Sequence, residues 1–268
     1  MLIDFYVPLY DEPGYGEALA ETARNLGFDR LCLVGGEAQY GLAANAEVRH
    51  QADRYPELFV PFARLNLGED GAAAVERYRR VGFQGLCAWG PPLPYDDEAF
   101  FPVYEAAEAL EMPVILHTGY LPATRLDRAR RVRVSHMRPA CLDTLARCFP
   151  ALDIVGVGLG SPWCEEAAET MRHHANVYFD LSGDVLRRKS AEFLGGLLRP
   201  PHTVLWDQEP VGNLWSRVVF GSGVRHEEIA SVERDYQRAF RSMALGAQDI
   251  DAVMGHTAAA LLGIPVVT

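Results

Sequence analysis

The sequence of 268 residues has no apolar run long enough to span a bilayer, which takes about 20 consecutive apolar residues. It is also poor in positive charge: 25 Lys and Arg stand against 36 Asp and Glu, for a net charge of −11. A nucleic-acid-binding surface is basic because it must neutralise phosphates. We therefore expect neither a membrane protein nor a nucleic-acid-binding protein.

Cysteine is scarce, and its spacing shows no redox or zinc motif. The five cysteines are Cys32, Cys87, Cys141, Cys148 and Cys164, and no two of them are spaced Cys-x-x-Cys. The N-terminus has no basic segment and no small-residue cleavage site, so no signal peptide is expected. Reduced, mostly buried thiols in a cytoplasmic protein are the expected state.

Short apolar runs alternate with longer amphipathic segments along the whole chain. Several runs are too apolar to be half exposed, which is typical of parallel strands covered on both faces. The runs that predict strands are Leu2–Val7, Arg30–Val34, Leu58–Leu65, Phe83–Trp89, Pro113–His117, Asp153–Leu159, Val177–Leu181 and Arg217–Phe220. The segments that predict helices are Gly16–Leu26, Gly71–Val81, Glu98–Leu110, Cys141–Phe149, Cys164–His174 and Glu227–Met243. This alternation predicts a single (β/α)8 TIM-barrel domain over residues 1–268, with a doubly wound sheet as the alternative.

Two long connections interrupt this alternation, and long loops in compact domains are often functional. The stretch Arg199–Asn213 contains Pro200, Pro201 and Pro210. The stretch Gly119–Met137 carries the arginines Arg125, Arg128, Arg130, Arg131 and Arg133. An anionic small-molecule substrate would suit these arginines electrostatically. The alternatives are a solvated loop or a contact between the subunits of a homo-oligomer.

Several motifs in a fixed order point to a family. They are FQGLCAWGPPLPYDDEAFFPVYEAAEALEMPVILHTG at Phe83–Gly119, RPACLDTLARCFPALDIVGVGLGSPW at Arg138–Trp163, NVYFDLSG at Asn176–Gly183, RVVFGSG at Arg217–Gly223 and MGHTAAALLGI at Met254–Ile264. Together they resemble the amidohydrolase-related barrels, the amidohydrolase 2 group, over nearly the whole chain. The resemblance implies a TIM barrel.

The same resemblance implies where a metal would be held. In that family two histidines of the first strand, one each of the fifth and sixth strands, and an aspartate of the eighth strand gather around zinc or a similar ion. The corresponding residues here are Tyr6, Pro8, His117, Gly158 and Gly223. Because one imidazole cannot hold a catalytic zinc against water, we expect no metal and no other cofactor.

The candidate site residues lie at or near the predicted carboxyl ends of strands, where barrel enzymes place their chemistry. His117 is a candidate general acid or base, because an unperturbed imidazole titrates near neutrality. Tyr6, Arg64, Trp89 and Asp180 are candidate substrate-binding residues, and Arg64 would pair with a substrate carboxylate through two hydrogen bonds. Structural roles are the alternative: a hydrogen-bonded interior histidine, a loop cap at Asp180, a core tryptophan and an internal ion pair of Arg64.

These residues predict a metal-independent hydrolase or lyase that acts on a small carboxylated molecule. Two alternatives stay open. One is a non-catalytic barrel that serves as a binding or assembly partner, and the other is a metal-dependent hydrolase with relocated ligands. Fold alone does not decide between them, because one barrel supports many functions.

Overall fold

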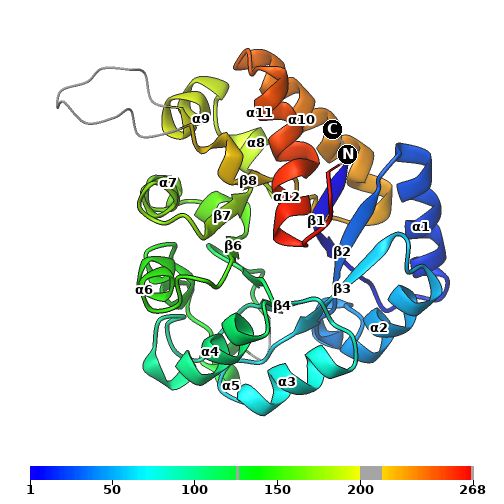
Figure 1. Ribbon diagram of the computed structural model, residues 1–268, viewed down its shortest axis with the longest axis vertical. Coiled ribbons are helices and arrows are strands. Elements are labelled where there is room, and N and C mark those ends of the chain that lie inside the picture. The colour runs from blue at the N-terminus through cyan, green and yellow to red at the C-terminus, as the bar shows by residue number, and fades with distance from the viewer. Residues whose placement is uncertain (125–126, 200–212, 267–268) are drawn as a thin grey trace.

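The predicted (β/α)8 barrel is confirmed in a computed structural model, which describes residues 1–124, 127–199 and 213–266. Eight parallel strands form one sheet in the order β1 to β8 (Figure 1). The strands are β1 Ile3–Pro8, β2 Arg30–Val34, β3 Phe59–Arg64, β4 Gly85–Ala88, β5 Val114–Leu116, β6 Ile154–Gly156, β7 Val177–Asp180 and β8 Val218–Val219. Each lies within or within one residue of a predicted run.

Backbone hydrogen bonds close the barrel between its first and last strands. The Phe5 N–H donates to the Phe220 carbonyl at 2.8 Å, and the Gly223 N–H donates to the Tyr6 carbonyl at 2.8 Å. Both partners of β1 lie just after the short strand β8, so the segment that follows β8 completes the seam. The residues at this seam therefore come from segments that are far apart in the sequence.

Helices surround the sheet (Figure 1). They are α1 Tyr15–Leu26, α2 Asn45–Arg54, α3 Ala72–Arg80, α4 Phe101–Ala109, α5 Asp127–Arg130, α6 Cys141–Cys148, α7 Cys164–His173, α8 Val185–Arg188, α9 Ala191–Leu198, α10 Ile229–Ser242, α11 Ala247–Asp251 and α12 Thr257–Leu261. All six predicted helices are present. Among the described residues, no helix is long and apolar enough to cross a membrane.

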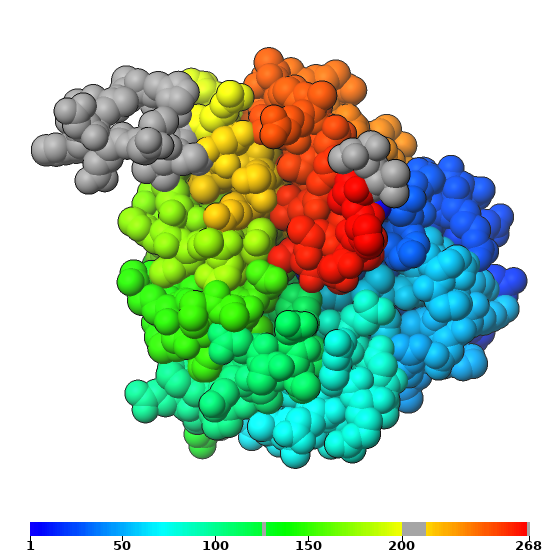
Figure 2. Space-filling model, in the orientation of Figure 1, coloured from blue at the N-terminus to red at the C-terminus, as the bar shows by residue number. Residues whose placement is uncertain are grey.

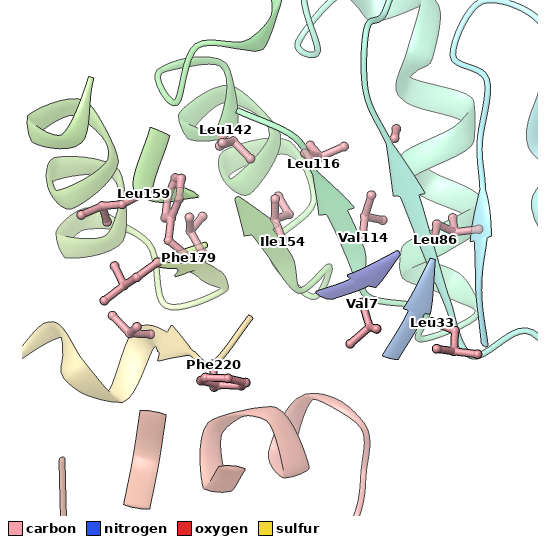
Figure 3. Packing of buried hydrophobic residues seen from close by; sticks show 14 of the residues in the cluster. Val7, Leu33, Leu86, Val114, Leu116, Leu142, Ile154, Leu159, Phe179 and Phe220 are labelled. Atoms are coloured by element: carbon pink, nitrogen blue, oxygen red, sulfur yellow. The ribbon is translucent and has the colours of Figure 1, made fainter. Parts of the chain in front are cut away.

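The strand side chains form two layers of core, as expected from alternation along a strand. In β4, Leu86 and Ala88 join the cluster that packs against the helices, whereas Cys87 joins the cluster inside the barrel. Figure 3 shows members of the outer cluster arising from neighbouring strands and from α6. Inside the barrel, the rings of Phe5 and Phe62 meet edge to face with centroids 5.4 Å apart.

Helix α12 covers the end of the barrel at which the strands begin. Its residues Ala258, Ala259 and Leu261 belong to the inner cluster, together with Ile3 at the start of β1. The segment coloured red lies over the middle of the face seen in Figures 1 and 2. The opposite end, where the strands finish, is left for the loops that carry the candidate site residues.

Glycine at position 156 is required by packing, which gives a test of the core. A Cβ on Gly156 would overlap the ring of Phe179 on the neighbouring strand. We expect Gly156→Ala to lower the free energy of unfolding by about 1–3 kcal/mol, because an overpacked core must shift. Gly71→Ala is the control, since a Cβ at Gly71 meets nothing within 4 Å. Equal urea midpoints for the two variants would contradict the packing seen around Phe179.

Candidate active site

Arg64 is the last residue of β3 and Trp89 directly follows β4, and their side chains lie together. The Arg64 guanidinium carbon lies 3.9 Å from the centroid of the Trp89 ring, and its Nη2 donates to the Trp89 carbonyl at 2.9 Å. Nη1 donates to the Leu65 carbonyl, and Nη2 also reaches Glu37 Oε1 at 3.3 Å. Burial lowers the pKa of Arg64, with Glu37 among the groups that oppose the shift. Both terminal nitrogens of Arg64 are thus engaged by the protein, which is the internal pairing considered as its alternative role.

A cavity of about 420 Å³ opens beside Arg64 and Trp89. This volume is within the range of small-molecule sites, roughly 300–1,000 Å³. Its walls come from the loops after β3 and β4 and from the segment around α5. The lining residues are Arg64, Asn66, Leu67, Gly68, Glu69, Trp89, Gly90, Pro92, Ala129, Arg130 and Arg131. The cavity therefore brings two predicted substrate-binding residues together with two arginines of the Gly119–Met137 stretch.

Glu37 joins Arg64 to the arginine-rich stretch. Its Oε1 receives Arg64, while its Oε2 receives Arg130 and, at 2.6 Å, the Gln39 side-chain amide. Its side chain is only 14% exposed, so both ion pairs are shielded from water on the carboxylate side. The sequence offered no signal for this role, because Glu37 follows β2 and contacts residues distant along the chain.

The other arginines of the stretch differ in their surroundings. Within the described part of the chain, Arg128, Arg131 and Arg133 form no ion pair. Arg131 alone of these three lines the cavity. Arg125 lies outside the described residues, as does nearly all of the proline-marked stretch Arg199–Asn213.

His117 follows β5 directly, and its ring is held by a backbone carbonyl. Nε2 lies 3.2 Å from the Tyr120 carbonyl, which can only accept, so Nε2 carries the proton and Nδ1 keeps its lone pair. Burial lowers the pKa of His117 to about 4, with the Tyr120 hydrogen bond opposing the shift. The imidazole is therefore neutral at pH 7. It is not among the residues that line the cavity beside Arg64.

Tyr95 connects His117 to the Arg64 region and was missed from the sequence. Its hydroxyl donates toward the His117 carbonyl at 2.9 Å and the Ala88 carbonyl at 3.1 Å. Burial raises the pKa of Tyr95 well above 10, with Arg64 among its charged neighbours. A tyrosine in a loop has no distinguishing pattern, so only the folded chain reveals that it ties the ends of β4 and β5 together.

The aromatic ring of Tyr6 packs against the backbone of Gly223. A Cβ on Gly223 would lie 3.2 Å from Tyr6 Cδ1 and 3.1 Å from the Ser182 Cβ, and its φ of +64° favours glycine. Burial raises the pKa of Tyr6 well above 10, and its electrostatic neighbours include Asp180 and Arg64. A neutral phenol thus stands against the eighth-strand glycine, near Asp180 and Arg64 but outside the residues that line the cavity.

Asp180 ties the end of β7 to the turn after β6. Its Oδ1 accepts from the Gly158 N–H at 2.6 Å, the Ser182 N–H at 3.0 Å and the Ser182 hydroxyl at 2.7 Å. Burial raises the pKa of Asp180 to about 6, although these hydrogen bonds oppose the shift. This geometry is that of the loop cap considered as its alternative role.

Asp4 joins β1 to the segment after β8 through hydrogen bonds to its carboxylate. It was not singled out from the sequence. Its Oδ1 accepts from the Ser222 N–H at 2.9 Å and the Tyr6 N–H at 3.2 Å. Burial raises the pKa of Asp4 to about 7, against hydrogen bonds from Ser222 and Tyr6. The signal that could have found it is its place two residues before Tyr6, which stands where the family resemblance puts the first of the two first-strand histidines.

The residues at the expected metal positions do not fit a zinc-type site. Gly158 and Gly223 have no side-chain donor, the Tyr6 ring packs on Gly223, and the proline ring of Pro8 offers no ligand atom. Across residues 1–124, 127–199 and 213–266, no three His, Cys, Asp or Glu side chains gather as metal ligands.

Comparison with known proteins adds a family and a set of similar folds. The sequence model of a family described as Amidohydrolase matches residues 34–264. No curated protein matches the sequence. An uncharacterized TIM-barrel protein from Bordetella bronchiseptica superposes with a TM-score of 0.74 at 17% identity, covering 98% of each chain.

Two further solved structures carry functional names. A 5-carboxyvanillate decarboxylase from Sphingomonas paucimobilis has a TM-score of 0.65 at 16% identity, covering 98% of this chain and 99% of that one. A probable 2-pyrone-4,6-dicarboxylic acid hydrolase from Acinetobacter baumannii, with citric acid bound, has a TM-score of 0.65 at 12% identity and the same coverage. At these identities the likeness establishes the fold alone.

Proposed function

The chain belongs to the amidohydrolase family, and from this premise we propose that it is a metal-independent hydrolase or lyase that acts on a small carboxylated molecule. The observation that carries the proposal is the cavity of about 420 Å³ at the carboxyl ends of β3 and β4. The cavity has an aromatic wall at Trp89 and positively charged arginines, which favour binding of a small anion. Barrel enzymes place their active sites at this end of the barrel.

The substrate class has support from similar structures. The decarboxylase is named for 5-carboxyvanillate and the hydrolase for 2-pyrone-4,6-dicarboxylic acid, both of which are carboxylated. In this chain both terminal nitrogens of Arg64 are used within the protein. We therefore assign Arg64 to positioning Trp89, and we expect the substrate carboxylate to be received on the Arg131 side of the cavity.

The chemistry would use the neutral side chains of His117 and Tyr6. Both lie outside the lining of the cavity, so the reacting part of the substrate would have to extend beyond the cavity to reach them. Among the described residues His117 Nδ1 has no hydrogen-bond partner, so it could accept a proton from water or substrate while Nε2–H donates to the Tyr120 carbonyl. The Tyr6 hydroxyl stays protonated, so it can donate a hydrogen bond to an oxygen that gains negative charge. Asp180 would hold the turn after β6 in place rather than touch the substrate.

A specific observation favours the non-catalytic alternative. Tyr6 and Gly223 stand at two of the positions where the family would hold metal ligands, and here the Tyr6 ring packs directly on Gly223. Such packing would persist in a barrel that only binds a ligand or another protein. A metal-dependent hydrolase with relocated ligands is the third candidate, and no described cluster of ligands favours it.

A turnover screen separates the three candidates. Wild-type protein is incubated with carboxylated lactones, amides and aromatic acids, with and without added zinc. We expect metal-independent turnover of at least one carboxylated compound. If none turns over, yet a ligand protects the protein from thermal unfolding, the non-catalytic alternative replaces the proposal. Turnover that requires zinc and disappears with a chelator would instead establish relocated ligands.

A further inference from the structure

A second cavity continues the first one outward along the rim of the barrel. It measures about 510 Å³ and shares Gly68, Glu69, Pro92 and Arg131 with the cavity beside Arg64. Its remaining wall is largely apolar and includes Leu93, Phe100, Pro102 and Val103. We call the two cavities together the rim groove. Arg131 stands where they meet.

The apolar wall has a buried base and an exposed edge: Phe100 and Val103 are buried, whereas Leu93 is exposed. Leu93 is 40% exposed and is one of four exposed large hydrophobic side chains in the described chain. The other three, Met1, Val81 and Tyr120, line neither cavity. A single exposed apolar side chain is ordinary on a protein surface, so Leu93 supports a binding site only because it lines a cavity that a ligand could fill.

Arg131 is held at the junction by an unfavourable backbone. Its φ is +55°, a left-handed conformation that side chains other than glycine and asparagine rarely adopt. The Val132 N–H donates to the Asp127 carbonyl at 3.0 Å, which keeps this turn at the end of α5. Strain of this kind is retained at functional sites more often than elsewhere. The neighbouring Arg130 is paired with Glu37, whereas Arg131 has no ion pair in the described chain.

We propose that the rim groove binds a small amphipathic carboxylate, with the carboxylate on Arg131 and the apolar body against Leu93 and the wall beside it. This deepens the proposed function by giving its carboxylated ligand an apolar arm and by naming the residue that receives the charge. Glu69 opposes an anion here, but it is exposed and so strongly screened. Asp70 also lines the outer cavity and keeps its negative charge, but its Oδ2 is directed at the Asn66 N–H, from which it accepts at 2.9 Å.

Calorimetric titration of the full chain with hexanoate, acetate and the neutral hexanamide tests both parts of the groove. A fully buried methylene strengthens binding about fourfold, and four methylenes separate hexanoate from acetate. Because the groove is open on one side, we expect hexanoate to bind about tenfold more tightly than acetate. Hexanamide should bind at least about tenfold more weakly than hexanoate, since it lacks the charge.

Matched variants locate the two contacts. Arg131→Gln should weaken hexanoate at least about tenfold, whereas Arg128→Gln, an exposed arginine that lines neither cavity, should leave it unchanged. Leu93→Ser should remove most of the preference for hexanoate over acetate, whereas Val81→Ser should not. Glu69→Gln should strengthen hexanoate about twofold by removing the opposing charge.

The outcomes that overturn the inference differ from those that overturn the enzyme. Equal affinities for hexanoate and hexanamide, or equal losses in Arg131→Gln and Arg128→Gln, would remove Arg131 as the receptor of the carboxylate. Absence of saturable hexanoate binding by the wild type would also overturn the subsite. None of these results depends on turnover, so the proposed enzymatic activity is decided separately by the substrate screen.

Discussion

His117→Gln is expected to lower turnover by about 10²–10⁴-fold while leaving the fold largely intact, because general acid–base catalysis contributes about that much. Glutamine keeps an N–H that can donate to the Tyr120 carbonyl, as Nε2 of the imidazole does. It has no basic nitrogen in place of Nδ1. The loss should therefore fall on the rate of the chemical step and not on the unfolding temperature.

The pH profile distinguishes this role from a structural one. Burial lowers the pKa of His117 to about 4, so the neutral form needed as a base is present above that pH. In the wild type kcat/KM should fall as pH drops through about 4, and this limb should be absent from the residual activity of the variant. His50→Gln, on the exposed side of α2, is the control.

Two results would count against the assignment. Unchanged turnover in His117→Gln would rule out an acid–base role. A lowered unfolding temperature with unchanged turnover per folded molecule would instead mark His117 as a hydrogen-bonded structural residue, because the glutamine amide would then fail to replace the hydrogen bond from Nε2 to the Tyr120 carbonyl.

The strands could be predicted because each is buried on both faces. Arg30–Val34 was predicted residue for residue, since a fully buried strand reads as a continuous apolar run. Helix α2 was missed because it is mostly polar and buries only Val48, Gln51 and Ala52, which is too few for a clear helical period. Strand β8 is shorter than its apolar run, because the seam is completed by the loop that follows it.

The sequence could predict which residues lie at the carboxyl ends of the strands, but not which of them share a cavity or what they bind. The strand ends placed Arg64 near Trp89 correctly. What Arg64 binds could not be predicted, because Glu37 is 27 residues away in sequence and the other acceptors are carbonyls. The near-neutral pKa expected for His117 is that of an imidazole in water, whereas burial lowers it. Desolvation depends on how the chain packs, so it cannot be predicted from the identity of a single residue in the sequence.

Asp4 is a second residue whose desolvation the sequence does not reveal. It also gives the largest expected effect on stability. Its carboxyl group is fully buried at the barrel seam, and its Oδ2 has no hydrogen-bond partner among the described residues. Burial raises its pKa from 3.8 to about 7. As pH rises from about 4 to 7 the unfolded chain loses this proton while the folded chain keeps it, so the free energy of unfolding falls across that window.

We therefore expect Asp4→Asn to be more stable than the wild type at pH 8, by about 2–4 kcal/mol, since one pKa unit is worth about 1.4 kcal/mol. The amide removes the cost of a buried charge and keeps an oxygen for the Ser222 N–H. At pH 4 most of the advantage should be gone, because the folded wild type then holds the proton and the unfolded chain is about half protonated. Urea unfolding at pH 4, 6 and 8 measures this, with the exposed Asp11→Asn as control. A variant less stable than the wild type at pH 8 would show that the hydrogen bonds from Ser222 and Tyr6 to an ionised Asp4 outweigh its desolvation.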